Sequence, residues 1–211
     1  MLSLQHHIQG FYAVTPDTAD TAQLCQMVEA ALQGGVNVLQ YRNKLADKPL
    51  QLLQARALLN LCQRYQTPLI INDDVALAKA INADGVHLGA SDGEIKAARA
   101  LLGDDKIIGA SCYNQLALAE EAVKNGASYV AFGACFASST KPNAPVADHA
   151  LFSQAAYLNV PRVAIGGITL ANAHLLKQAG ADAIAVINAL FSAENITKTA
   201  TEFNQIFNQY T

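Results

Sequence analysis

Charged residues are scarce in this sequence. Only 15% of its 211 residues are Asp, Glu, Lys or Arg, and the formal net charge is −3. A chain so close to neutrality has no general electrostatic attraction to nucleic acid or to an anionic membrane surface. The composition therefore favours work on small molecules, and we expect neither nucleic acid nor membrane among the partners.

Signals for membrane insertion, export or a cysteine framework are also missing. No apolar run approaches the roughly 18 residues of a membrane-spanning helix, and the first residues lack the apolar core of a signal peptide. The four cysteines, Cys25, Cys62, Cys112 and Cys135, include no CxxC pair. Such spacing favours buried thiols in a reducing compartment over disulfides or a zinc site. We therefore expect a cytoplasmic protein.

The usual glycine-rich nucleotide loops and the serine-hydrolase elbow are absent as well. The sequence contains no GxGxxG after its first apolar run, no GxxxxGK[ST] and no GxSxG. The first two absences argue against a doubly wound nucleotide-binding sheet, and the third argues against a covalent serine hydrolase.

What the sequence does contain is a regular alternation of short apolar runs with longer segments of helical spacing. Eight runs rich in Val, Ile and aromatic residues recur along the chain, at 11–14, 36–39, 69–71, 85–88, 107–110, 129–132, 162–165 and 183–186. Eight such units predict an α/β protein, a single (β/α)₈ TIM barrel spanning residues 1–211 without a linker. An open doubly wound sheet is the alternative.

Polar side chains follow these runs, where a barrel places its functional residues. Gln40, Arg42 and Lys44 alternate at the end of one run, so they are expected to project to one side. Arg forks onto diphosphate oxygens and Lys neutralises a further charge, which predicts a diphosphate site. The alternative is a solvated strand end with a surface ion pair.

Carboxylates end two neighbouring units. Asp73 follows the run 69–71, and Asp92 lies just beyond the run 85–88. Two carboxylates, completed by water and phosphate oxygens, suit Mg²⁺. A helix cap is the competing role of Asp92, Asp17 is expected to cap a helix, and Asp74 is expected to start one. His87 is expected in the barrel interior rather than on a metal.

Hydroxyls and glycines supply further candidates for anion binding. Gly167 in the segment 166–168 and Asn188 after the last run resemble a barrel phosphate pocket, with a tight turn as the alternative. Ser111 ends the fifth run, and the loop 138–142 carries Ser138 and Lys141. That loop predicts anion binding, with a mobile polar loop as the alternative.

These segments resemble the thiamine phosphate synthase family over nearly the whole barrel. The most specific ones are residues 40–44, 71–73, 84–92, 132–142 and 164–168. The resemblance implies joining of 4-amino-2-methyl-5-(diphosphooxymethyl)pyrimidine to 4-methyl-5-(2-phosphoethyl)thiazole, physiologically in its carboxylated form. The products would be thiamine phosphate and pyrophosphate, with CO₂ from the carboxylated form, and the cofactor would be Mg²⁺.

The resemblance also implies a role for each site residue. Gln40, Tyr41, Arg42, Asn43, Lys44 and Asn72 would bind the pyrimidine diphosphate, Asp73 and Asp92 would hold Mg²⁺, and Ser111 and Lys141 would contact the diphosphate or the pyrimidine. Ser138, Ser139, Thr140, the backbone of Gly167, Ile187 and Asn188 would receive the thiazole phosphate. A catalytic set of Arg42, Lys44, Ser111 and Lys141 would stabilise the departing pyrophosphate without a protein nucleophile.

The sequence departs from the family pattern in places, among them the pair Cys112 and Tyr113, to which we assign no consequence. Ala90 stands where Gln is common, Ser138 where Thr is frequent, and Asn188 where Ser is frequent. Ser138 and Asn188 still form hydrogen bonds, so these changes bear on thiazole phosphate binding more than on the reaction. A thiazole tautomerase of the same barrel family and a noncatalytic phosphate-binding barrel stay open as alternatives, as does assembly into a homo-oligomer.

Overall fold

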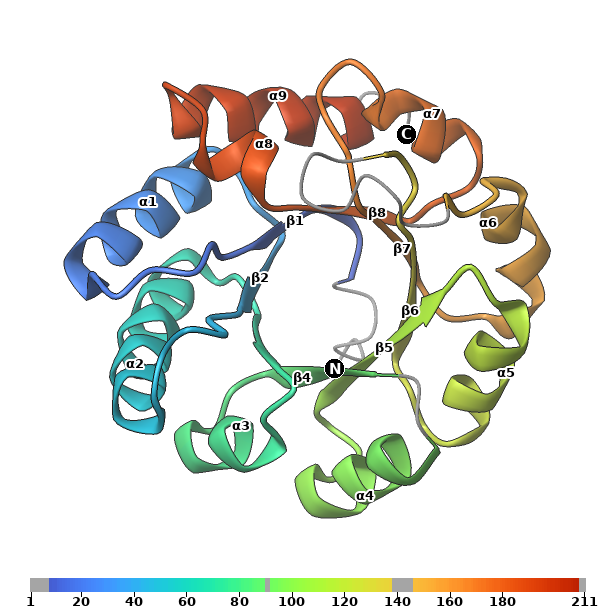
Figure 1. Cartoon of the computed structure of the whole chain (residues 1–211), viewed down its shortest axis with the longest axis horizontal. Helices are drawn as coiled ribbons and strands as arrows, with labels where there is room; N and C mark the ends of the chain where they lie inside the picture. Colours follow the sequence, from blue (N-terminus) through green and yellow to red (C-terminus); the bar gives the residue numbers. More distant parts are fainter. Residues whose placement is uncertain (1–7, 90–91, 138–145, 209–211) are drawn as a thin grey trace.

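Eight parallel strands close into a barrel, in sequence order, with β8 paired back to β1 (Figure 1). The computed structural model describes residues 8–89, 92–137 and 146–208, with backbone only at residues 92, 93 and 208. The strands are β1 (Gly10–Val14), β2 (Val38–Tyr41), β3 (Leu69–Asn72), β4 (Gly85–Gly89), β5 (Ile107–Tyr113), β6 (Tyr129–Phe132), β7 (Arg162–Ile165) and β8 (Ala183–Val186). The predicted barrel is confirmed, whereas its extent over residues 1–211 as one domain stays a prediction.

Helices surround the barrel and alternate with its strands (Figure 1). They are α1 (Thr21–Gln33), α2 (Lys48–Tyr65), α3 (Val75–Ile81), α4 (Asp92–Leu102), α5 (Leu116–Lys124), α6 (Ala150–Gln154), the 3₁₀ helix η2 (Ala155–Leu158), α7 (Ala173–Gln178), α8 (Asn188–Phe191) and α9 (Ile196–Asn208). Within the described residues, no helix is long and apolar enough to cross a membrane.

Aspartate side chains start the first three helices. Asp20, Asp47 and Asp74 each accept a hydrogen bond from the backbone amide three residues later. Such caps satisfy amides that have no partner within the helix. The predicted role of Asp74 at a helix start is confirmed.

The pleat of the strands divides their side chains between two apolar layers. Phe11 of β1 packs outward against Phe203 of α9, with the ring centroids 4.9 Å apart, whereas Tyr12 and Val14 belong to the cluster inside the barrel. The same alternation runs through β2, where Val38 lies inside and Leu39 outside. Polar residues at interior positions are therefore directed to the axis of the barrel and its mouth.

Candidate active site

The loop after β2 is fastened to the loop after β1. The Thr15 hydroxyl donates to the carbonyl of Arg42 at 2.8 Å and accepts from its amide at 2.9 Å. Nη1 of Arg42 lies 3.2 Å from both carboxylate oxygens of Asp17, and the backbone amide of Lys44 donates to Asp17 at 2.7 Å. These contacts hold the guanidinium of Arg42 and the backbone of Lys44, two residues of the predicted diphosphate site.

The expected helix cap at Asp17 is wrong. Asp20 caps α1, and Asp17 is instead bound to the β2 loop. The ion pair considered for Arg42 is present, with both side chains a little under 30% exposed. Only one guanidinium nitrogen takes part in it, and a guanidinium has five N–H donors, so Arg42 still has donors for a ligand.

Tyr41 and Asn43 turn away from the barrel axis, because they alternate with Gln40 and Arg42. The Tyr41 hydroxyl donates to Oε1 of Gln54 on α2 at 2.8 Å, and the Asn43 amide donates to the same oxygen at 3.0 Å. Burial raises the pKa of Tyr41 to about 12, so the phenol stays neutral. Both side chains brace the loop against α2, and their direct contact with substrate stays a prediction.

Asn72 and Asp73 lie together at the end of β3. Nδ2 of Asn72 donates to Oδ2 of Asp73 at 2.7 Å, and the Asp73 amide donates to the carbonyl of His87 on β4 at 2.9 Å. Asp73 has a positive φ of 61°, which its short polar side chain tolerates better than most. The bend turns the chain out of the strand directly into the Asp74 cap of α3.

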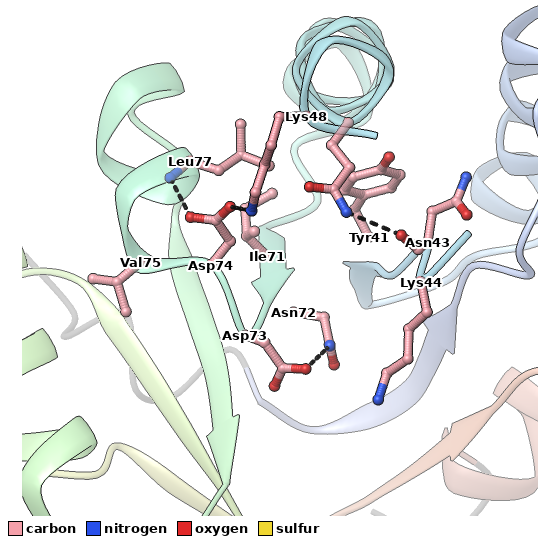
Figure 2. A pocket seen from close by; sticks show the side chains of 11 residues that line it. Tyr41, Asn43, Lys44, Lys48, Ile71, Asn72, Asp73, Asp74, Val75 and Leu77 are labelled. Carbon is pink, nitrogen blue, oxygen red and sulfur yellow. Dashed lines mark hydrogen bonds and ion pairs between the residues drawn. The ribbon is translucent and has the colours of Figure 1, made fainter. Parts of the chain in front are cut away.

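A cavity of about 440 Å³ opens between these two loops. Figure 2 shows Lys44, Asn72 and Asp73 extending to the same side, while Lys48 reaches the carboxylate of Asp74 at 2.6 Å. Burial tends to raise the pKa of Asp74, but hydrogen bonds from Lys48 and from α3 amides outweigh it and lower the pKa below its usual value. The cavity is therefore lined by Lys44 and Asp73 and by the ion pair of Lys48 with Asp74.

Polar side chains inside the barrel form one continuous chain of hydrogen bonds. Nε2 of Gln40 donates to the Tyr12 hydroxyl at 2.9 Å, and that hydroxyl lies 2.9 Å from the Tyr129 hydroxyl. Nδ1 of His87 lies 2.8 Å from the Tyr129 hydroxyl, and its Nε2 lies 2.8 Å from Oγ of Ser111. Burial lowers the pKa of His87 to about 4, so the imidazole is neutral at neutral pH. The expected interior position of His87 is confirmed.

The loops after β6 and β7 lie against each other near the predicted phosphate pocket. The amide of Phe136 donates to the carbonyl of Gly166 at 3.0 Å. Gly167 has a φ of 67°, and a Cβ there would lie 2.5 Å from the carbonyl oxygen of Phe136. Both constraints require glycine, so the tight turn considered as the alternative for Gly167 is present. Ile187 directly precedes α8, which begins at Asn188, and a phosphate contact at Gly167, Ile187 and Asn188 stays a prediction.

Part of the predicted site lies outside the described residues. This holds for Ser138, Ser139, Thr140 and Lys141, and also for the side chain of Asp92, whose backbone begins α4. Within the described residues, no group of three or more His, Cys, Asp or Glu side chains is placed to hold a metal ion. Of the two predicted metal ligands, Asp73 is therefore the one whose carboxylate lies within the described residues.

The roles of several supporting residues were not predicted from the sequence. Thr15, Asp17 and Gln54 hold the β2 loop, and their partners are 11 to 27 residues away in sequence. Tyr12 and Tyr129 lie in two of the predicted apolar runs, and no role was predicted for their hydroxyls. Their alternation with Phe11 and Val130 was the available signal, since a tyrosine at an interior position needs a partner for its hydroxyl.

Comparisons with known proteins agree on one protein family. A family model described as thiamine monophosphate synthase matches residues 11–190. A protein of Methylobacillus flagellatus named thiamine-phosphate synthase is 63% identical over 201 residues, covering 95% of this chain and 96% of the relative. One of the same name from Azoarcus sp. is 54% identical over 201 residues, covering 95% and 98%.

A solved structure agrees with these relatives. The thiamine phosphate pyrophosphorylase from Pyrococcus furiosus superposes with a TM-score of 0.85 at 32% identity, covering 98% of both chains. Chain length, fold and sequence are thus similar over the full barrel.

Proposed function

Because the chain belongs to the thiamine monophosphate synthase family, we propose that it joins 4-amino-2-methyl-5-(diphosphooxymethyl)pyrimidine to 4-methyl-5-(2-phosphoethyl)thiazole. The products are thiamine phosphate and pyrophosphate. The physiological thiazole is the carboxylated form, which also yields CO₂. The family and the named relatives make the chain an enzyme that forms a C–N bond; its substrates and mechanism are proposed here.

One observation carries the proposal: Arg42 and Lys44 share a mouth with Asn72 and Asp73. Arg42 is held by Asp17 and Lys44 extends toward the same side as Asp73 (Figure 2). Cations beside a single amide-supported carboxylate suit a diphosphate that arrives with a divalent ion. A ligand with one phosphate would not require both sets of residues.

The described donors fit Mg²⁺. Asp73 offers a hard carboxylate oxygen oriented by Asn72, and Asp92 at the start of α4 is the proposed second ligand. Mg²⁺ accepts few protein ligands and keeps waters and phosphate oxygens, so two carboxylates suffice. When bound, the ion supplies charge neutralisation of the leaving diphosphate.

The protein then acts by orientation and electrostatics. Arg42 and Lys44 bind the diphosphate oxygens and stabilise the charge that develops as the C–O bond breaks. Ser111 and Lys141 complete the proposed catalytic set. The pyrimidinyl methylene cation is captured by the thiazole nitrogen, which the Gly167 loop, Ile187 and Asn188 hold through the thiazole phosphate, together with the 138–140 segment.

The tautomerase alternative needs a side chain that is free to move a proton. His87 lies inside the barrel, and both of its ring nitrogens are already hydrogen-bonded to hydroxyls. Burial lowers the pKa of His87 to about 4, which makes the ring a weak base for abstracting a substrate proton at neutral pH. The cytoplasmic location and a homo-oligomeric assembly stay predictions.

Pyrophosphate release with both substrates tests the proposal. We expect release only with Mg²⁺, and a loss of about 100-fold or more for Asp73→Ala and for Arg42→Ala, because each removes a charge partner of the leaving group. Arg64→Ala is the matched control, since Arg64 pairs with Glu29 on the outer helices. Metal-independent turnover, or normal turnover by both site variants, contradicts the assignment.

A further inference from the structure

The hydrogen-bond chain inside the barrel links two residues of the proposed pyrimidine site. It begins at Gln40 on β2, passes through Tyr12, Tyr129 and His87, and ends at Ser111 on β5. Its four contacts measure 2.8 to 2.9 Å, within the range of good hydrogen bonds.

The barrel is shaped around the middle of this chain. A Cβ at Gly109 would lie 2.1 Å from Cζ and 2.3 Å from the hydroxyl of Tyr129, so glycine at that position makes room for the ring. The imidazole of His87 stacks on the same ring with the centroids 5.6 Å apart. The Tyr129 hydroxyl is thereby fixed between its two neighbours.

A count of hydrogens leaves this chain only two orderings. Each hydroxyl owns one hydrogen, and a neutral imidazole owns one N–H. When Gln40 donates to Tyr12, Tyr12 must donate to Tyr129, Tyr129 to Nδ1 of His87, and Nε2 of His87 to Ser111. When the Gln40 side-chain amide rotates so that Oε1 and Nε2 exchange places, the donor and the acceptor exchange roles in every hydrogen bond of the chain. Any other ordering leaves a buried hydrogen without an acceptor or two lone pairs facing each other, which is strongly disfavoured.

The two ends of the chain consequently have opposite character. In the first ordering the free half of the Gln40 amide is an acceptor, and the Ser111 hydroxyl keeps its hydrogen to donate. In the reversed ordering Gln40 presents its N–H₂ group, and Ser111 offers only lone pairs. Nε2 of Gln40 faces the Tyr12 hydroxyl, and with this amide orientation the hydrogen count gives the first ordering.

We propose that this chain couples Gln40 and Ser111, so that the mouth always presents one donor and one acceptor and selects a heterocycle with the complementary pair. The inference rests on the proposed function for its ligand, since an aminopyrimidine has an amino group that donates and ring nitrogens that accept. A ring that offers two donors or two acceptors breaks one bond of the chain. Tyr12, Tyr129 and His87 are positioning residues that need not touch the substrate.

Nitrogen-15 NMR of the histidine rings tests the coupling without any substrate. We expect His87 to be a single neutral tautomer with its hydrogen on Nε2, identified by the loss of its signals in His87→Gln. Gln40→Glu should move the hydrogen to Nδ1, because an ionised carboxylate only accepts and forces the reversed ordering. Ionisation of the introduced carboxylate is checked by its carbon-13 shift.

Two further variants define the outcome. Gln63→Glu, an equivalent change at an exposed position of α2, should leave the His87 tautomer as it is. Adding Tyr129→Phe to Gln40→Glu cuts the chain, so the tautomer should no longer follow residue 40. An unchanged tautomer in Gln40→Glu, or a mixture of tautomers in the unmodified protein, overturns the coupling.

Kinetics separates this inference from the proposed function. Ser111→Ala alone should lower kcat/KM for the pyrimidine diphosphate about 10-fold or more. In a Tyr129→Phe background the same change should cost less than about 3-fold, because the chain no longer orients the Ser111 hydroxyl there. Equal losses in both backgrounds contradict the coupling. A tautomer switch without any turnover would refute the proposed function and leave the coupling standing.

Discussion

Replacing Asp17 with alanine tests whether the contact between the first two loops positions Arg42 for catalysis. The carboxylate holds the guanidinium at 3.2 Å through both oxygens and the amide of Lys44 at 2.7 Å. The variant loses both contacts while every proposed substrate ligand remains. We expect kcat/KM for the pyrimidine diphosphate to fall about 5- to 30-fold, with a small change in stability.

The magnitude follows from the contacts. The ion pair is partly exposed, so it contributes about 0.5 kcal/mol to folding, and the bond to the Lys44 amide adds about 1 kcal/mol. A charge-assisted bond from Arg42 to the diphosphate is worth about 1.5 to 3 kcal/mol. An unrestrained guanidinium loses most of this, about 1 to 2 kcal/mol, which gives the expected fold-change. The lost repulsion between Asp17 and the diphosphate acts in the opposite direction but is screened by salt.

The assay is steady-state pyrophosphate release by Asp17→Ala, Arg42→Ala and the double variant. The Asp17 change should matter little once Arg42 is absent, because its effect acts through that side chain. Glu29→Ala, which breaks the Arg64 pair at 3.1 Å on the outer surface, is the matched control and should keep full activity. Unchanged kcat/KM in Asp17→Ala, or an equal loss in the Arg42→Ala background, would refute the positioning role.

Three other predictions follow from single contacts. Gly167→Ala should raise KM for the thiazole phosphate at least about 10-fold and destabilise the protein by about 1 to 3 kcal/mol, measured by kinetics and urea unfolding, because it meets both a φ of 67° and a carbonyl at 2.5 Å. Tyr41→Phe should lower the free energy of unfolding by about 1 to 2 kcal/mol, measured by urea unfolding, because it loses the buried bond to Gln54. The pKa of His87 is about 4 in the folded protein and about 6.5 in the unfolded protein, so the neutral imidazole makes its full contribution to the free energy of unfolding above pH 6.5, and this contribution is lost as pH falls toward 4. His87→Gln should remove about 3 kcal/mol of that pH dependence in unfolding experiments.

The eight strands were predictable because each is a short apolar run bounded by turn residues, and the pattern repeats. Differences appear where polar residues continue a strand. The predicted run is 36–39, but β2 begins at Val38 and ends at Tyr41, so both of its ends lie two residues later. β5 continues to Tyr113 through a register shift after Ser111. Hydrogen bonds to neighbouring strands extend these ends, and apolar periodicity carries no signal for them.

The site was predictable to the extent that it depends on strand ends. Asn72 and Asp73 meet as expected, since adjacent residues at one strand end share a location. The role of Asp17 was missed because a helix begins four residues later, at Thr21, and local sequence favours a cap. Only the pairing of β1 with β2 brings Asp17 to Arg42, and such long-range contacts leave no local trace.

The position of each residue along β2 and the loop that follows it determines which part of the substrate that residue would contact in the proposed reaction. Val38 and Gln40 are successive inward positions of β2, and Arg42 follows the end of the strand, so the side chains change from apolar to hydrogen-bonding to cationic. Two residues along a strand span about 6.6 Å, which separates the ring-binding level at Gln40 from the diphosphate level at Arg42. The C–O bond that breaks would lie between these levels, so pyrophosphate stays with the charged rim while the cation remains beside neutral hydroxyls. Variants at the rim should therefore slow bond cleavage, whereas variants of the interior chain should change which ring is accepted.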